Sequence, residues 1–230
     1  MIGSGDVISY LEMCSALGVN LQRGMNFRLR NDESLILMSM RPGAPYSDRV
    51  EQGGRVIVYE GHDVPRTNTC PNPKSVDQSE RQPSGRPTQN GLFMEAVNRY
   101  KSGEAAERVK VFEKIRPGIW VYNGLFELVD GWQETVGNRR VFKFELRILD
   151  QPEAVSRVGN TRVDQDRVIP SSVKVEVWKR DKGRCVICGG KENLHFDHII
   201  PYSRGGSSKD AKNIQILCAK HNLEKRDRIQ

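Results

Sequence analysis

The chain has 230 residues, a length that fits one large domain or a medium domain with a smaller one. Its 37% hydrophobic and 28% charged content is typical of a globular protein and excludes collagen-like, mucin-like and coiled-coil classes. The sequence has neither a long uncharged apolar window nor a signal-peptide pattern. We therefore expect a cytoplasmic protein that does not contact a membrane.

The cysteines and the excess positive charge both concentrate near the C-terminal end. Five cysteines is an odd number, and three of them fall in the last 46 residues, which fits a disulfide framework poorly and indicates a reducing compartment. Residues 171–230 carry 13 Lys and Arg against 7 Asp and Glu, or +6 of the net charge of +7. A concentrated positive field is typical of a protein that binds a polyanion, although ordinary solubilising charge is an alternative.

Two helices and a series of strands are predicted. One helix covers residues 6–18 and ends at Gly18 as a C-cap, and the other covers residues 89–103. Runs rich in Val, Ile, Phe and Tyr between Gly, Pro and Asn predict strands at residues 34–40, 55–61, 109–115, 118–132 and 139–149. The pattern indicates an α+β fold with a twisted, mainly antiparallel, barrel-like sheet and flanking helices.

Two polar segments divide the chain. Residues 66–90 form a loop rich in Pro, Ser and Asn, and a loop of this length inside a domain is usually functional or disordered. Residues 151–172 have little apolar content and are interpreted as a linker. The predicted domains are therefore residues 1–150 and 173–230.

A metal-ligand pattern lies in the smaller domain. Cys185 and Cys188 form a Cys-x-x-Cys pair, and Cys218 and His221 follow with a Cys-x-x-His spacing. Two thiolates on a tight turn, with a Cys and a His one helical turn apart, can enclose a tetrahedral Zn²⁺ ion. About 60 residues bury too little apolar surface to fold alone, so a structural zinc would supply the missing stability.

Inside this zinc frame the sequence reads LHFDHIIP at residues 194–201, GGS at 205–207 and NIQILCAKHNLEK at 213–225. These motifs resemble the HNH, or ββα-metal, nucleases over nearly all of residues 178–228. The resemblance implies two short strands and a helix that hold a DNA phosphodiester at one divalent ion.

The resemblance also implies roles for individual residues. His198 would be the general base, because a neutral imidazole accepts a proton near neutral pH. Asp197 and Asn222 would hold catalytic Mg²⁺ or Mn²⁺ through oxygen atoms. Asn213 would fix the loop that bears His198. His221 is assigned to zinc, which leaves Asn222 as the second ligand of the catalytic ion.

Three further residues near these motifs have open roles. His195 shares a strand face with Asp197, so it either approaches the catalytic site or serves only the structure. Lys225 and Arg226 are candidates for phosphate contacts, with solvated helix charges as the alternative.

The larger domain resembles the SRA, or SRA-YDG, domains, which bind DNA with a modified cytosine and flip that base into a pocket. The resemblance spans roughly residues 20–150 and depends on the stretches 34–63 and 122–147, with Tyr-Asn-Gly at 122–124 where the family has Tyr-Asp-Gly. It implies that Tyr46 and Tyr59 stack on the flipped base and that Asp48 accepts from the cytosine N4 amine. Loop residues 66–90 would face DNA and become ordered on binding.

Together these features predict a type IV-like, modification-dependent restriction endonuclease acting on double-stranded DNA with 5-methylcytosine or 5-hydroxymethylcytosine. Since one HNH site cuts one strand, a double-strand break predicts a homodimer. Two alternatives stay open: a reader of modified DNA that does not cleave, and an HNH nuclease that acts on unmodified DNA.

Overall fold

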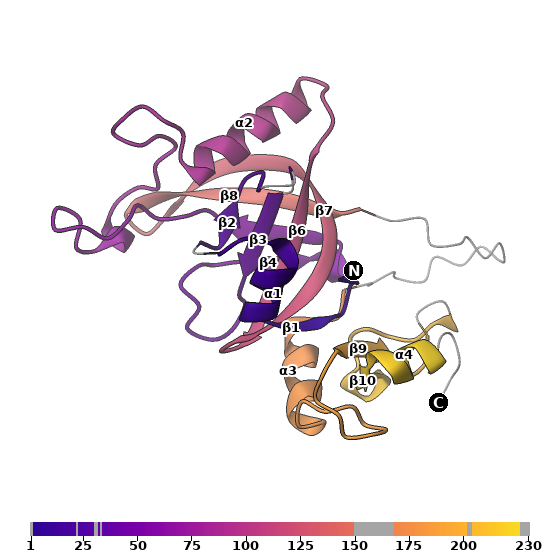
Figure 1. The fold of residues 1–230 in the computed structure, drawn as a ribbon. Coiled ribbons are helices and arrows are strands. Elements are labelled where there is room, and N and C mark those ends of the chain that lie inside the picture. The colour runs from indigo at the N-terminus through magenta and orange to yellow at the C-terminus, as the bar shows by residue number, and fades with distance from the viewer. Residues whose placement is uncertain are drawn as a thin grey trace.

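The computed structural model describes residues 2–21, 23–29, 32, 34–149, 168–201 and 204–225. Its main feature is an eight-stranded sheet with the order β2-β3-β6-β7-β8-β5-β4, in which β1 pairs with β7 outside this path. The strands are β1 (Val7–Ser9), β2 (Met25–Asn26), β3 (Ser34–Met38), β4 (Arg49–Glu51), β5 (Val56–Glu60), β6 (Glu107–Arg116), β7 (Ile119–Val136) and β8 (Arg139–Ile148). The helix α2 (Gln89–Lys101) lies across this sheet (Figure 1).

The sheet is mainly antiparallel, as predicted, but the two ends that the structure describes do not meet. Within the described residues its ends, β2 and β4, are not joined, so the sheet is twisted and open instead of a closed barrel. In addition, β3 and β6 are parallel, whereas the other neighbouring strands are antiparallel. A parallel pair needs a long crossover, and the chain between β3 and β6 supplies one that includes α2.

The strand β7 organises the sheet because it is long enough to serve several partners. On one edge it pairs with β6, and on the other it pairs with β1 near its start and with β8 farther along. The register shifts where Val111 pairs with Gly124 and Phe112 with Tyr122, which leaves Asn123 as an extra residue on β7. Such a bulge redirects a side chain away from the regular alternation.

Both predicted helices of this region are present, with one shorter than expected. The first, α1 (Tyr10–Leu17), starts at a capping box of Ser9 and Glu12 and ends at Gly18 in the left-handed region, as predicted. The prediction was wrong for residues 7–9, which form β1 because Val7 and Ile8 pair with the edge of β7. Thr88 caps α2, whose buried face includes Phe93 and Val97.

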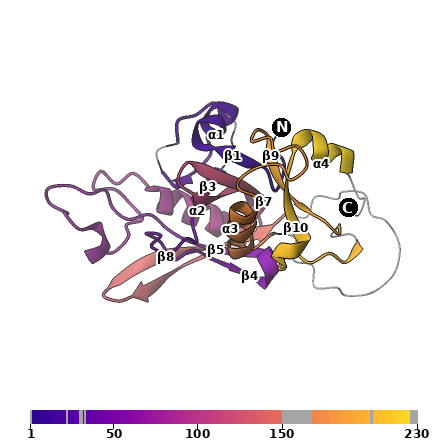
Figure 2. The same cartoon turned by 90° about the horizontal axis from the view of Figure 1, so that it is seen from below.

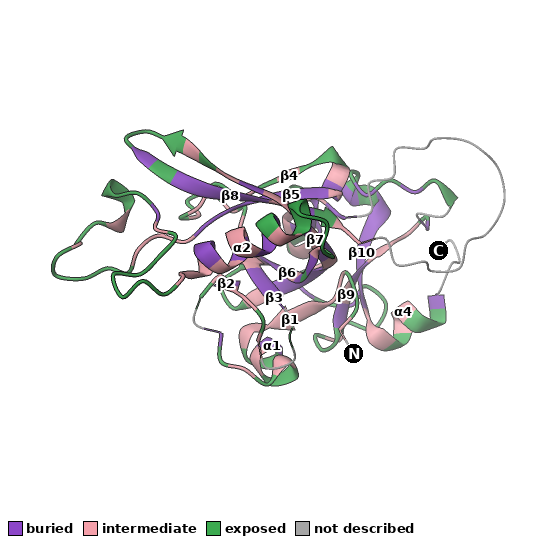
Figure 3. Ribbon diagram, turned by 90° about the horizontal axis from the view of Figure 1, so that it is seen from above, coloured by how far each residue is buried: buried purple, intermediate pink, exposed green. Residues whose placement is uncertain are grey.

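The C-terminal unit consists of α3 (Ser171–Arg180), the antiparallel pair β9 (Leu194–His198) and β10 (Ile214–Cys218), and α4 (Ala219–Lys225). Viewed from below, it lies beside β1 at one end of the large sheet (Figure 2). Buried residues continue from the sheet into this unit (Figure 3). The described helices include none that is long and apolar enough to cross a membrane.

Most of the predicted linker, residues 151–167, lies outside the described residues. The last part of the predicted segment has structure. Val168 is buried with the sheet core, Ile169 is buried with the core of the C-terminal unit, and α3 begins at Ser171.

Candidate functional site

The predicted zinc ligands come together. Cys185 and Cys188 lie on the turn after α3, Cys218 ends β10, and His221 lies in the first turn of α4. Their ligand atoms all lie within 4.8 Å of one another. The Cys188 and Cys218 sulfurs are 3.9 Å apart, and the Cys218 sulfur is 3.2 Å from His221 Nδ1.

This cluster fits a zinc ion. A tetrahedron with Zn–S distances near 2.3 Å places two sulfurs about 3.8 Å apart, which matches the observed spacing. Burial opposes ionisation of Cys185, but N–H groups at residues 187, 188 and 218 lower the pKa of its thiol to about 6. A thiolate is the form that binds metal. The three cysteines and His221 could therefore hold zinc without rearrangement.

His198 ends β9, where it pairs with Ile214, at the opposite end of the β9–β10 pair from Cys218. Its Nε2 lies 2.8 Å from Oγ of Ser208, which is itself buried. Burial lowers the pKa of His198, opposed by the neighbouring Asp197 carboxylate and assisted by the Lys225 ammonium. The imidazole is therefore neutral at neutral pH, which is the form that accepts a proton.

Asn213 holds the loop between β9 and β10. Its Oδ1 accepts from the Ile200 N–H at 2.8 Å, and its Nδ2 donates to the carbonyls of Ile200 and Ser207 at 3.2 and 3.1 Å. Gly206 permits this closure, because a Cβ atom there would lie 1.9 Å from the Ile200 carbonyl oxygen. The buried Asn213 side chain thus holds together the two parts of the loop after His198, at Ile200 and at Ser207.

Asp197 faces a lysine and an amide. Its Oδ2 lies 2.9 Å from Lys225 Nζ and accepts from Gln215 Nε2 at 3.3 Å. Lys225 is almost fully buried and also donates to the His198 carbonyl at 2.6 Å. Asn222 lies three residues before Lys225 on α4, about one helical turn away. Arg226 lies outside the described residues.

His195 contacts a residue outside this group. Its Nδ1 contacts the Asp6 carboxylate, and the two residues also form an isolated antiparallel bridge between β9 and the segment before β1. Within the described structure its buried Nε2 has no hydrogen-bond partner. The residue thus lies at the junction of the two units, which fits its structural role and not an approach to the catalytic site.

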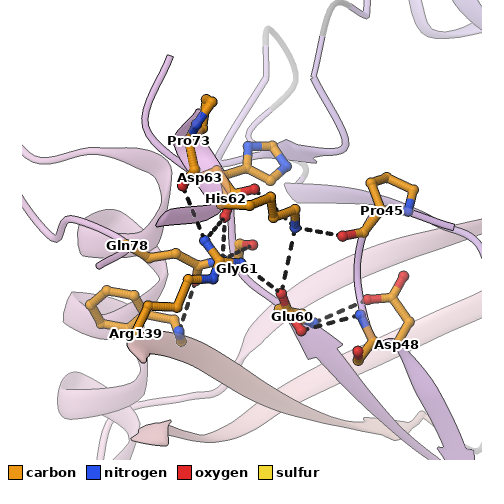
Figure 4. Close-up of polar contacts among 12 residues, drawn as sticks. Pro45, Asp48, Glu60, Gly61, His62, Asp63, Pro73, Gln78 and Arg139 are labelled. Atoms are coloured by element: carbon orange, nitrogen blue, oxygen red, sulfur yellow. Dashed lines mark hydrogen bonds and ion pairs between the residues drawn. The ribbon is translucent and has the colours of Figure 1, made fainter. Parts of the chain in front are cut away.

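A second polar site lies in the large sheet, where the chain enters β4 and leaves β5. Asp48 Oδ2 accepts from the Ser39 N–H at 3.1 Å. Its Oδ1 accepts from the Glu60 N–H at 3.0 Å, as Figure 4 shows. Burial raises the pKa of Asp48 to about 6, although these N–H groups oppose the shift. The carboxylate is therefore fixed in orientation and titrates close to neutral pH.

The predicted tyrosines meet at a histidine. The Tyr46 and His62 rings are stacked with centroids 6.0 Å apart, and the Tyr59 hydroxyl lies 3.3 Å from His62 Nε2. Tyr59 is fully buried, whereas Tyr46 is partly exposed. Burial lowers the pKa of His62 to about 4, with a further contribution from Arg23, so this imidazole is neutral.

Buried charges support this aromatic group. Glu60 is 4% exposed and lies between Lys143 at 2.9 Å and Arg139 at 3.4 Å, and Arg139 also contacts Asp63 at 2.6 Å (Figure 4). Lys74 contacts Asp63 at 2.9 Å, with its Nζ 4.0 Å from the Tyr46 ring centroid.

The long polar loop is anchored to the sheet at several points. Besides Lys74, the buried Gln78 donates to the Gly61 carbonyl at 2.7 Å and accepts from the Phe142 N–H at 2.8 Å. Between these anchors and beyond them the loop is exposed, including Arg66, Arg81 and Arg86. The loop is therefore tied beside Tyr46 even without DNA.

Sequence reasoning missed several of these residues. The aromatic group includes His62. Other elements supply the polar residues that surround this group, which are Lys74, Gln78, Arg139 and Lys143. The only sequence signal for them is charge on otherwise apolar strands, as with Lys143 between Phe142 and Phe144. In the C-terminal unit, Ser208 and Gln215 were also missed.

With this geometry established, comparison with known proteins is informative. Residues 185–228 match the family model of the HNH endonucleases. The chain carries an HNH endonuclease domain. The match confirms the resemblance of the C-terminal motifs, and a metal-dependent DNA nuclease is the activity of such a domain. No curated protein matches the chain.

Several solved structures are similar at low TM-score. The SRA domain of SUVH5 with hemimethylated CG DNA is 25% identical, with a TM-score of 0.46, over 66% of this chain and 93% of that chain. The same domain with fully hydroxymethylated CG DNA is 23% identical, with a TM-score of 0.45 over the same shares. The modification-dependent TagI restriction endonuclease is 21% identical, with a TM-score of 0.43, over 97% of this chain and 77% of that chain.

Proposed function

We propose that the chain is a modification-dependent restriction endonuclease. Residues 1–150 would extrude 5-methylcytosine or 5-hydroxymethylcytosine from duplex DNA, and the HNH domain would then hydrolyse a phosphodiester. The observation that carries the proposal is that one chain holds an HNH site around His198 together with a distant aromatic group of Tyr46, Tyr59 and His62 beside the Asp48 carboxylate.

For cleavage, His198 would act as the general base that deprotonates water. Its neutral state and its contact with Ser208 support this role, because the ring is oriented and ready to accept a proton. Asp197 and Asn222 would hold Mg²⁺ or Mn²⁺, which when bound neutralises charge that develops on the phosphate. Lys225 would position Asp197 and the backbone of His198, with zinc on the cysteine cluster bracing the helix.

For recognition, the extruded base would stack on Tyr46, next to His62 and Tyr59. Extrusion costs a few kcal/mol of stacking and pairing, and an aromatic face returns about 1–3 kcal/mol per base. Asp48 would accept from the cytosine N4 amine. Its two oxygens already accept backbone N–H groups, but each keeps a second lone pair, and the backbone bonds hold the carboxylate in one orientation.

The loop of residues 66–90 would contact the DNA backbone through Arg66, Arg81 and Arg86 and fill the space left by the base. Because Lys74 and Gln78 already anchor the middle of the loop, the ordering on binding would concern the exposed stretches on either side of them, which carry Arg66, Arg81 and Arg86. Amide exchange in those stretches should slow when modified DNA is added. Unchanged exchange would contradict this role.

A homodimer would make the double-strand break, because each HNH site cuts one strand. Gel filtration should show a dimer with modified DNA. A monomer under all conditions, combined with efficient double-strand cutting, would contradict the dimer.

The test of the proposal compares methylated and unmethylated plasmid incubated with enzyme and Mg²⁺. We expect wild type to cut only the methylated plasmid and His198→Ala to bind it without cutting. Binding without scission by wild type would identify a reader instead. Equal cutting of both plasmids would identify a nuclease that ignores the modification.

A further inference from the structure

The HNH domain and the large sheet share one hydrophobic core. Ile115 and Val121, from β6 and β7, are buried together with Val173 and Val177 of α3 and Phe196 of β9. Such a core differs from the sparse contacts expected between domains joined by a flexible linker. The two units are therefore packed as one body where they meet.

Backbone hydrogen bonds cross the same junction. The segment before β1 lies between β7 and β9. In this segment the Gly5 N–H donates to the Tyr122 carbonyl at 2.8 Å, and the Gly5 carbonyl accepts from the Phe196 N–H at 3.1 Å. The contact between Asp6 and His195 lies beside them. The strand that carries the catalytic motif is thus linked through residues 5 and 6 to the central strand of the large sheet.

A buried polar triad completes the junction. Lys174 of α3 places its Nζ 2.7 Å from Glu113 Oε2 and donates to Asn123 Oδ1 at 2.6 Å, while Asn123 Nδ2 donates to Glu113 at 3.1 Å. Each of the three residues is 2% exposed. Burial acts to raise the pKa of Glu113, but Lys174 keeps it below its usual value, so the pair is ionised.

The sequence explains why Asn123 reaches this position. It is the extra residue of the bulge in β7, and Gly124, with φ of 120°, allows the backbone to turn there. The SRA triplet has Asp at this place, and an Asp would put a second carboxylate beside Glu113. The amide instead accepts from Lys174 and donates to Glu113, which satisfies both neighbours.

A buried ion pair of this kind contributes little net stability, because desolvation offsets the attraction between the charges. It does strongly disfavour every arrangement in which one charged partner is buried without the other. An apolar core alone would tolerate small rotations of the HNH domain against the sheet. The triad, in contrast, pairs both charges and the Asn123 amide in only one relative orientation of the two units. The arrangement therefore specifies how the HNH domain sits on the sheet.

We infer that Lys174, Glu113 and Asn123 are positioning residues that fix the HNH domain on the recognition unit, which is the proposed base-binding part of residues 1–150. The chain would then cut at one set distance from the modified base. The inference rests on the proposed function. The distance is then built into the protein and does not depend on the length of residues 151–167.

The test uses the full chain and two readouts. The variants are Lys174→Met and the double variant Glu113→Gln with Lys174→Met, which removes both charges and keeps the side-chain sizes. Arg140→Ala is the control, because it breaks an exposed ion pair with Asp77 that is remote from the junction. Thermal melting identifies a variant that fails to fold, and the double variant avoids leaving an unpaired buried charge.

The first readout is amide exchange at Phe196, which requires no activity. We expect exchange at least tenfold faster in both variants and unchanged exchange in the control. The second readout is the set of cut positions on a duplex with one modified cytosine. We expect one dominant position for wild type and control and several positions for the variants, with binding of modified DNA within twofold of wild type.

Wild-type exchange at Phe196 together with a single cut position in the double variant would overturn the inference, since shape alone would then position the domain. Wild type that cuts unmodified DNA equally well would instead overturn the proposed function, and Phe196 exchange would still decide whether the triad holds the junction.

Discussion

In the HNH domain the groups that meet at the site all fall within residues 185–225, whereas in the large sheet they are spread over residues 46–143. Cys218 and His221 are separated by 3 residues, and His198 and Ser208 by 10. In the recognition unit, Glu60 meets Lys143 from 83 residues away. A site built from local turns carries a motif, while a site built from distant strands does not.

The two sites also differ in how burial is compensated. The HNH site relies on a cysteine cluster that needs a metal, together with a loop closed by one amide. The recognition site rests on buried charges around Glu60 that satisfy each other. We therefore expect changes in the first region to act on fold and catalysis, and changes in the second to act on discrimination between bases.

The largest effect should follow from removing a zinc ligand. Cys218→Ser should abolish cleavage and unfold the HNH domain, because structural zinc contributes roughly 10 kcal/mol or more of apparent folding free energy in small domains. Elemental analysis should give one zinc per chain for wild type and almost none for the variant. The control is Cys70→Ser, which changes a cysteine outside the cluster. A zinc-free wild type that is folded and active would contradict the assignment.

Removing the proposed general base should have the next largest effect. His198→Ala should lower the single-turnover cleavage rate by about 10²–10⁴-fold, which is the usual contribution of general-base catalysis. Ser208→Ala should cost about tenfold, since it removes only the hydrogen bond that orients the ring. Binding of modified DNA should be unchanged in both. Equal rates for His198→Ala and wild type would remove His198 from the mechanism.

In the recognition unit, Tyr46→Ala should reduce the preference for modified over unmodified DNA by roughly 5- to 150-fold, the equivalent of about 1–3 kcal/mol of stacking. Competition binding with matched duplexes measures this ratio. Tyr100→Ala is the control, because Tyr100 is an exposed tyrosine on α2. An unchanged ratio in Tyr46→Ala would place the base elsewhere.

The smallest effect concerns pH. Asp48 has a pKa of about 6, so it is ionised above that pH and protonated below it. The ionised carboxylate can accept a hydrogen bond from the N4 amine with either oxygen, whereas protonation turns one oxygen into a donor. Affinity for modified DNA should therefore fall by up to about tenfold per pH unit below 6. His62, with a pKa of about 4, does not titrate in this window. A flat affinity between pH 7 and pH 5 would exclude Asp48 from base recognition.

The raised pKa of Asp48 also affects folding stability, and there the pH dependence is opposite to that of DNA affinity. Since the folded-state pKa of Asp48 lies above the unfolded value of about 3.9, the group favours folding most at low pH, and this contribution is lost as pH rises through about 6. Tight DNA binding and maximal stability of this site therefore occur at different pH values.

Sequence reasoning predicted the zinc cluster, both N-terminal-unit helices and most strands, because each depends on local spacing or periodicity. It extended the first helix over residues 7–9, since β-branched residues at a helix start also suit the free edge of β7. It predicted a mainly antiparallel, barrel-like sheet, because periodicity alone does not reveal which pair runs parallel, here β3 and β6, or that the sheet stays open.

The junction could not be predicted at all. Glu113, Asn123 and Lys174 look like ordinary polar residues in the sequence, and only the bulge at Asn123 and the docking of α3 bring them together. The same holds for His62, whose neighbours Tyr46 and Tyr59 were predicted from a resemblance while the histidine itself carries no motif.

The central claim is that an altered cytosine held by the large sheet licenses cleavage by the HNH domain. The most direct measurement is single-turnover cleavage of matched duplexes with cytosine, 5-methylcytosine, 5-hydroxymethylcytosine or glucosylated 5-hydroxymethylcytosine at one position, with Mg²⁺ present. The account predicts rapid cutting of at least one modified duplex, negligible cutting of the unmodified one, and loss of this difference in Tyr46→Ala. Equal rates on all four duplexes would contradict it.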